Sequence, residues 1–205
     1  ANRLGGNSLS DLLVFGKLAG DGAADYINEL NAPPSINQDQ VTSSVRYATE
    51  ILNRESGTNP YLLHEELQEA MQDKVGIVRS DELLTEGIEQ LEKFKEAYKD
   101  VKADGASQFN PGWHEALSLR NLIITAEAVA KSALLREESR GGHTRVDFPG
   151  EREEGLEYNI VVSKQSDGLM KTEKVHRPKG DEELMRIAYS TIEELEQEVA
   201  SERSK

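Results

Sequence analysis

The feature of the sequence that most constrains the fold is a series of segments whose apolar residues recur every three or four positions. The clearest covers residues 84–101, with apolar side chains at Leu84, Ile88, Leu91, Phe94, Tyr98 and Val101. This spacing places them on one face of an α-helix. Residues 41–52, 63–75 and 113–134 repeat the pattern between Gly- and Pro-containing breaks. Because helices joined by short connections pack antiparallel, we expect a small up-and-down bundle.

Further elements are expected on both sides of this bundle. Asn7 or Ser8 is a good N-cap for a helix that should end at Gly20, and a short helix over 23–30 should follow it. Residues 156–162 and 169–176 read as two strands of a hairpin, and 181–200 read as one acidic C-terminal helix. The predicted fold class is mainly α, an antiparallel helical bundle with a small β-hairpin and a C-terminal helix.

Composition excludes several classes of function. The chain has 38 acidic and 24 basic residues and a formal net charge of -14, which disfavours nucleic acid and anionic membrane surfaces as partners. It has no cysteine, so thiolate zinc sites and directly ligated iron-sulfur clusters are excluded, and its four scattered histidines suggest no metal site. No apolar run approaches the roughly 20 residues that span a bilayer, so no direct membrane insertion is expected.

The opening segment combines groups that could form half of an anion or cofactor site. Gly5 and Gly6 would let a ligand approach the backbone, the helix that follows would offer free N–H groups, and Arg3 is a two-pronged donor suited to a carboxylate. The same residues also describe an ordinary turn and helix cap, which the local pattern alone favours.

Two longer motifs carry a family resemblance. Residues 2–9 (NRLGGNSL) with 11–16 (DLLVFG), and residues 136–149 (REESRGGHTRVDFP), closely resemble signatures of the succinate dehydrogenase and fumarate reductase flavoproteins. Residues 110–114 (NPGWH) resemble a bacterial, actinobacterial-like branch of that family. The resemblance covers residues 1 to about 150 and implies the fold of the family's C-terminal domain.

The resemblance implies roles for three residues. Arg3 matches the arginine that binds a carboxylate of the dicarboxylate substrate, and Ser8 and Leu9 match residues whose backbone meets the pyrimidine end of the flavin ring of FAD. The implied chemistry is hydride transfer between flavin and succinate or fumarate. The glycine-rich dinucleotide fingerprint, the histidine that carries FAD and the proton-donating arginine are absent from this sequence. We therefore expect no catalytic residue and no bound FAD in this chain, and no succinate oxidation by it.

The resemblance also implies an organisation and partners. Residues 1–34 would be a remnant of the FAD-binding domain, 35–145 the helical bundle, and 146–205 an irregular segment, the hairpin and the terminal helix. Because Ala1 opens inside a motif, we expect the C-terminal portion of a longer protein. The implied partners are the FAD-binding and capping domains of the same polypeptide and an iron-sulfur subunit, with partner subunits holding the protein at the cytoplasmic face of a bacterial membrane.

Individual side chains outside the opening motif have structural interpretations. Arg140 and Arg145 are expected to form ion pairs that fix their loop, with Glu138 and Asp147 among the nearby acids. His143 is expected at an interface between helical and flavin domains. Trp113 is expected to be a packing anchor. Two alternatives remain open: a portion of an L-aspartate oxidase, or a standalone helical protein-interaction module.

Overall fold

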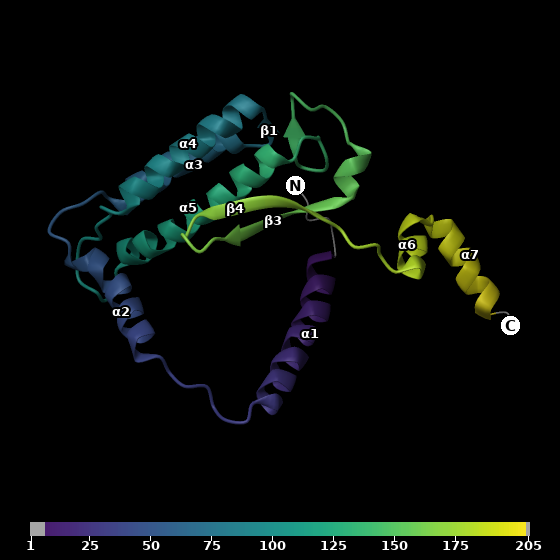
Figure 1. Cartoon of the computed structure of the whole chain (residues 1–205), viewed down its shortest axis with the longest axis horizontal. Helices are drawn as coiled ribbons and strands as arrows, with labels where there is room; N and C mark the ends of the chain where they lie inside the picture. The colour runs from purple at the N-terminus through teal and green to yellow at the C-terminus, as the bar shows by residue number, and fades with distance from the viewer. Residues whose placement is uncertain (1–6, 204–205) are drawn as a thin grey trace.

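The computed structural model describes residues 7–203, and a bundle of three helices forms its core. Helices α3 (Pro60–Val75), α4 (Asp81–Tyr98) and α5 (Pro111–Leu135) lie side by side (Figure 1). The large apolar side chains that they bury are Leu63, Leu67, Val75, Leu84, Leu91, Phe94, Leu119 and Ile123. Small residues on α5, including Ala116 and Ala130, complete the packing and allow close approach of the neighbouring helices.

Each helix of the bundle begins at a side-chain cap. Asn59 Oδ1 accepts a hydrogen bond from the backbone N–H of Tyr61 at 2.9 Å, and Ser80 Oγ accepts one from Leu83 at 3.2 Å. Asn110 Oδ1 accepts from Trp113 N–H at 2.9 Å. These bonds satisfy N–H groups that have no partner inside the helix. The starts of these helices are therefore fixed by local chemistry.

Helix α2 (Gln38–Asn53) joins the bundle only at its C-terminal end (Figure 1). Ile51 is its one buried residue, and Trp113 Nε1 donates to the carbonyl of Ala48 at 2.7 Å. Trp113 thus acts as the predicted packing anchor. Residues Val41 and Val45 of the same apolar stripe remain exposed, so this helix crosses the end of the bundle and does not run along it.

Helix α1 (Asn7–Glu29) is continuous, and the predicted stop at Gly20 is wrong. A glycine C-cap requires a left-handed backbone, and Gly20 and Gly22 are not among the glycines with positive φ. An ion pair between Lys17 and Asp21, four positions apart, stabilises the helix around Gly20. Two glycines cost helix stability, yet they do not end a helix unless the chain turns there.

The predicted hairpin is present and packs along α5. Strands β3 (Tyr158–Lys164) and β4 (Met170–His176) pair antiparallel, with Tyr158 opposite His176. A shorter parallel pair, β1 (Val78–Arg79) with β2 (Thr144–Arg145), ties the connection between α3 and α4 to the loop after α5. A 3-10 turn, η1 (Glu153–Leu156), leads from that loop into β3.

The single C-terminal helix that the sequence predicts is in fact two helices, α6 (Glu182–Tyr189) and α7 (Ile192–Arg203). The break lies at Ser190 and Thr191. Thr191 N–H donates to Glu194 Oε2 at 2.8 Å, and Glu194 N–H donates to Thr191 Oγ1 at 3.2 Å. This reciprocal pair is a capping box, which starts a new helix. The fold class is otherwise as predicted, mainly helical with an antiparallel hairpin, and no helix within residues 7–203 is long and apolar enough to span a bilayer.

The bundle core predicts a contrast between two leucines. Leu84 is fully buried between the helices, whereas Leu62 on α3 is 58% exposed. We expect Leu84→Ala to lower the free energy of unfolding by about 3 kcal/mol, because it leaves a cavity, and Leu62→Ala to change it by less than about 0.5 kcal/mol. Urea unfolding of both variants measures the difference, and equal losses would show that α3, α4 and α5 do not form the core.

Candidate functional site

The predicted cofactor-contacting residues lie in the first turn of α1. Ser8 and Leu9 are adjacent and exposed, and Leu9 exposes 69% of its surface. Backbone N–H groups in the first turn of a helix have no partner within the helix and carry the positive end of its dipole. The first turn of α1 can therefore offer donors to an electron-rich group. Arg3, the predicted substrate-binding residue, lies outside the described residues.

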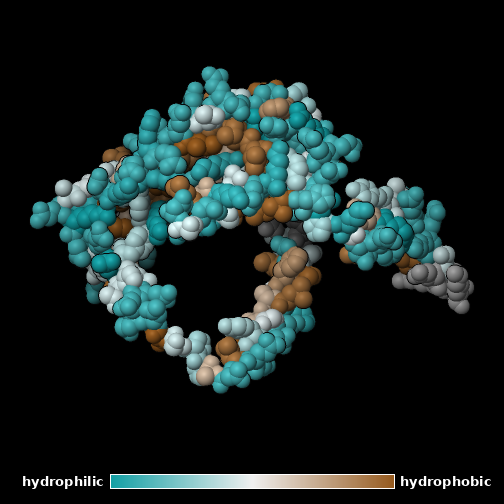
Figure 2. Space-filling view, in the orientation of Figure 1, coloured by the Kyte–Doolittle hydropathy of each residue, from teal (hydrophilic) through white to brown (hydrophobic). Residues whose placement is uncertain are grey.

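The first half of α1 presents an apolar surface that no helix of the bundle covers. Six apolar residues in its first half, each between 55% and 76% exposed, are Leu9, Leu12, Leu13, Val14, Phe15 and Leu18. Figure 2 shows this hydrophobic surface and the open space that α1, α2 and the bundle enclose. A helix that is apolar over most of its circumference is normally buried. The exposed apolar surface of α1 thus adjoins the predicted site residues Ser8 and Leu9.

The second motif folds into a loop organised by a buried carboxylate. Glu138 is 1% exposed and pairs with the guanidinium groups of Arg136 and Arg140. The backbone N–H of Arg152 also donates to Glu138 Oε2 at 3.0 Å. Burial alone would raise the pKa of Glu138, but these hydrogen bonds outweigh it and hold the pKa at about 2. Gly155 is required here, because a Cβ atom at this position would lie 2.1 Å from Glu138 Oε1.

A buried guanidinium in the same loop closes the C-terminal end of α5. Arg145 is 1% exposed and donates to the carbonyls of Ala133, Leu134 and Arg136 at 3.1, 3.0 and 3.3 Å. Its other nitrogens form a two-pronged pair with Asp147, at 2.8 and 2.7 Å. A cation at this position satisfies carbonyls without helical partners and opposes the negative end of the helix dipole.

Asp147 extends this network to α4. Its Oδ2 accepts a hydrogen bond from the backbone N–H of Asp81, in the first turn of that helix, at 2.9 Å. The hydrogen bonds from Arg145 are the main reason that the pKa of Asp147 lies well below its usual range. One carboxylate thus links the start of α4 to the cation that caps α5. The predicted pairing of Arg140 and Arg145 with nearby acids is confirmed.

His143 occupies a structural position in this loop. Its Nδ1 lies 2.6 Å from Arg79 Nη1, and its Nε2 lies 3.1 Å from the carbonyl of Arg136. Burial and the nearby arginine charges lower the pKa of His143, while its bond to the Arg136 carbonyl opposes the shift. A neutral ring that accepts from Arg79 and donates to the carbonyl fits these contacts. The expected flavin-domain interface at His143 stays a prediction.

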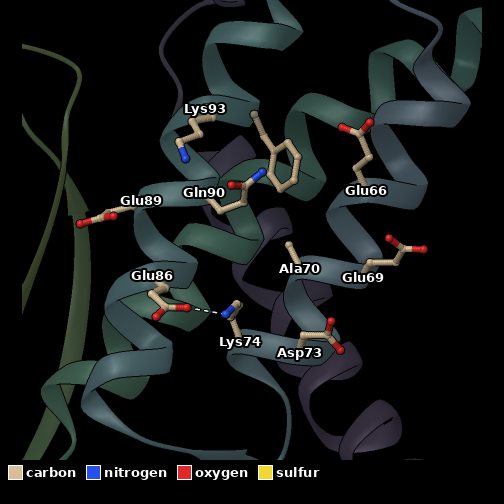
Figure 3. A pocket seen from close by; sticks show the side chains of 10 residues that line it. Glu66, Glu69, Ala70, Asp73, Lys74, Glu86, Glu89, Gln90 and Lys93 are labelled. Carbon is tan, nitrogen blue, oxygen red and sulfur yellow. Dashed lines mark hydrogen bonds and ion pairs between the residues drawn. The ribbon is translucent and has the colours of Figure 1, made fainter.

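An acidic groove between α3 and α4 is a further concave surface, with a volume of about 450 Å³. Figure 3 shows Glu66 and Glu69 on one side and Glu89 on the other, with Lys74 turned toward Glu86 in an ion pair. The hydrogen bond to Glu86 is the main reason that the pKa of Lys74 is raised. Among the described residues no group of His, Cys, Asp and Glu could hold a metal ion. The groove is a charged helical surface without a catalytic constellation.

Sequence reasoning missed the partners that lie far along the chain. The contacts from Gly155, Arg152 and Asp81 to this loop, and that from Arg79 to His143, join residues 14 to 66 positions apart. Local spacing carries no signal for such contacts. In the sequence, only the motif at residues 136–149 indicated that this loop is important.

Comparisons with known proteins agree with this fold and these motifs. Residues 64–193 match a family model described as fumarate reductase flavoprotein C-term. The fumarate reductase flavoprotein subunit of Mycobacterium tuberculosis is 32% identical over 178 residues, which cover 83% of this chain and 30% of that protein. An uncharacterized FAD-dependent oxidoreductase of Methanocaldococcus jannaschii is 35% identical over 162 residues, which cover 79% of this chain and 29% of that protein.

A solved structure gives the same result. A chain of the Mycobacterium smegmatis Sdh1 complex in the apo form superposes with a TM-score of 0.82 at 39% identity, covering 95% of this chain and 35% of that chain. The fold is thus that of a domain found in flavoprotein subunits of oxidoreductases, the class to which these relatives belong. The chain belongs to the succinate dehydrogenase/fumarate reductase flavoprotein family, and it matches the C-terminal domain of that family. It spans about a third of the length of these relatives.

The buried carboxylate of the loop predicts a pH dependence. Because the folded-state pKa of Glu138 is about 2 and its unfolded value is roughly 4.3, its contribution to stability is complete above about pH 4.3 and is lost as pH falls toward 2. We expect Glu138→Gln to lower the free energy of unfolding at pH 7 by about 3 kcal/mol and to flatten its decrease between pH 5 and 2.

Glu137 provides a matched control for this experiment, because it is exposed and adjacent in sequence. Glu137→Gln should keep both the stability at neutral pH and the slope of wild type. Chemical unfolding at several pH values measures both quantities. A Glu138→Gln variant whose stability falls in parallel with that of wild type between pH 5 and 2 would contradict the assigned pKa.

Proposed function

We propose that this chain forms the C-terminal part of the FAD-bearing subunit of a succinate dehydrogenase or fumarate reductase. The observation that carries the proposal is α1, which contains most of the first family motif and presents an apolar surface that the bundle does not cover. In a protein of this family the partner for such a surface is the FAD-binding domain of the same polypeptide. The relatives, about three times as long as the match, have room for that domain.

The proposal assigns a role to each segment. Residues 1–34 complete the FAD-binding domain, residues 35–145 form a helical scaffold beside it, and residues 146–205 extend the scaffold through the hairpin and the terminal helices. The buried network around Glu138 and Arg145 holds the scaffold rigid where the second motif lies. The iron-sulfur subunit that takes electrons from the flavin borders this domain, and partner subunits hold the protein at the cytoplasmic face of the membrane.

The chain's own chemistry in this role is binding and positioning. Arg3 binds a carboxylate of succinate or fumarate through its two-pronged donor geometry. The backbone N–H groups at Ser8 and Leu9 lie in the first turn of α1, where the helix dipole favours negative charge on a reduced ring. When bound, the flavin would supply the acceptor for the hydride that leaves a methylene carbon of succinate. These groups meet one edge of the ring and one end of the substrate, so the chain alone neither retains FAD nor oxidises succinate.

Reconstitution tests the proposal. We expect the purified chain to lack flavin absorbance and succinate oxidation, and to recover both when the FAD-binding and capping domains of a full-length relative are supplied as a second polypeptide. Leu13→Glu, on the apolar surface of α1, should weaken this assembly at least about tenfold, because it buries a charge. Leu62→Glu, at an exposed position on α3, should leave assembly unchanged.

Two readouts separate docking from substrate binding. Gel filtration with absorbance at the flavin band reports assembly, and steady-state kinetics reports substrate binding. Arg3→Lys should raise KM for succinate in the assembled protein without loss of flavin, because lysine cannot form the two-pronged contact. Assembly of the Leu13→Glu variant at wild-type strength would contradict the docking role of α1. Flavin-dependent turnover by the chain alone would contradict the claim that FAD binding and succinate oxidation need the other domains.

A further inference from the structure

A cleft of about 640 Å³ lies between the tip of the hairpin and helices α4 and α5. The helices form one wall and the ends of β3 and β4 form the other. Its apolar lining consists of Ile123, Ile124, Val162, Leu169 and Met170. Figure 2 shows hydrophobic surface along α5, between α4 and the hairpin. Small-molecule sites in proteins are typically clefts of this size with mainly apolar walls and a few polar groups.

The hairpin wall of the cleft is held by a closed turn. The backbone N–H of Gln165 donates to the carbonyl of Leu169 at 2.9 Å, and that of Gly168 donates to the carbonyl of Gln165 at 2.9 Å. Gly168 has a φ of 86°, in the left-handed region that glycine adopts without strain. Asp167 Oδ1 accepts from Leu169 N–H at 2.9 Å. These bonds fix the backbone of the turn, which carries Leu169 at the cleft.

The acidic groups that line the cleft already have cationic partners. Lys95 Nζ lies 2.8 Å from Glu92 and 2.7 Å from Glu127, which is almost fully buried. Lys99 Nζ lies 2.6 Å from Glu96. Lys131, outside the lining, also pairs with Glu127, so three lysines in all neutralise these three carboxylates.

Two cations in the lining remain without such a partner. Within residues 7–203, Arg120 and Lys164 form no ion pair with a carboxylate. The guanidinium of Arg120 lies 5.0 Å from the ring centroid of Tyr47, whose hydroxyl is 3.0 Å from that of Tyr98. This stacking positions Arg120 while its N–H groups stay available. On a chain of net charge -14, the cleft therefore has an excess of positive charge beside apolar walls.

We propose that this cleft binds a small amphipathic anion, with an apolar chain against the side chains of α5 and the hairpin and a carboxylate head at Arg120 and Lys164. The ligand class follows from the two features together. Apolar walls alone would bind any hydrophobic molecule, whereas the cations Arg120 and Lys164 favour a ligand with a negative head group. The site is separate from α1 and does not depend on the flavin role proposed above.

Three probes with the same ten-carbon chain test the proposal: decanoate, decanol and decyltrimethylammonium. Methyl NMR of the chain, with isoleucine, leucine, valine and methionine labels, locates the binding. We expect decanoate to bind saturably with shifts at the cleft methyl groups, decanol to bind about tenfold more weakly, and the cationic probe to give no shifts there. Equal affinity for the three probes, no saturable binding of decanoate, or shifts confined to α1 would overturn the proposal.

Charge-removal variants provide the matched comparison. Arg120→Gln combined with Lys164→Gln should weaken decanoate binding about tenfold and leave decanol binding unchanged. Lys93→Gln combined with Lys179→Gln removes the same charge from exposed positions outside the cleft and should bind decanoate as wild type does. All four substitutions are at exposed side chains, and circular dichroism checks that the fold is kept. Decanoate binding of equal strength in both double variants would refute the assignment of the head group.

Discussion

The buried guanidinium of Arg145 is the interaction on which the rest of this structure depends. It satisfies carbonyls at the end of α5 and pairs with Asp147, which in turn accepts a hydrogen bond from the first turn of α4. A buried charge is stable only when it is fully paired, so these contacts must form together. The consequence is a fixed angle between the two longest helices of the bundle and a fixed start for the loop that follows.

Glu138 links the end of α5 to the segment that leads into the hairpin. Its carboxylate forms ion pairs with Arg136 and Arg140 and accepts a hydrogen bond from the backbone N–H of Arg152. Gly155 lies so close to this carboxylate that no side chain would fit there. Arg136 also stacks over the ring of Tyr158, the first residue of β3, at 4.8 Å. The second family motif is therefore a structural junction that orients the hairpin on α5, and the cleft at the hairpin tip is one product of that orientation.

Helical periodicity predicted the helices of the bundle and the alternating pattern predicted the hairpin, because both signals act within a few residues. The same local reasoning failed at Gly20, which was predicted to end a helix that in fact continues. It also failed at Thr191, where a capping box starts a new helix within a continuous apolar stripe. It also could not show that α2 contacts the bundle only at its end. For the candidate site, the motif pointed to Ser8, Leu9 and the arginines of the loop, and the distant partners of those arginines had no local signal.

The sequence by itself determined most of the helices, the hairpin, the family to which the chain belongs and the short-range ion pairs that can form, because these depend on neighbouring residues and on characteristic strings of side chains. Tertiary structure decided which charges are buried. It holds the pKa of Glu138 at about 2, leaves Arg120 and Lys164 without a carboxylate partner among residues 7–203, and exposes the apolar side of α1. Burial and charge compensation depend on elements far apart in the chain, so they exist only once those elements have packed.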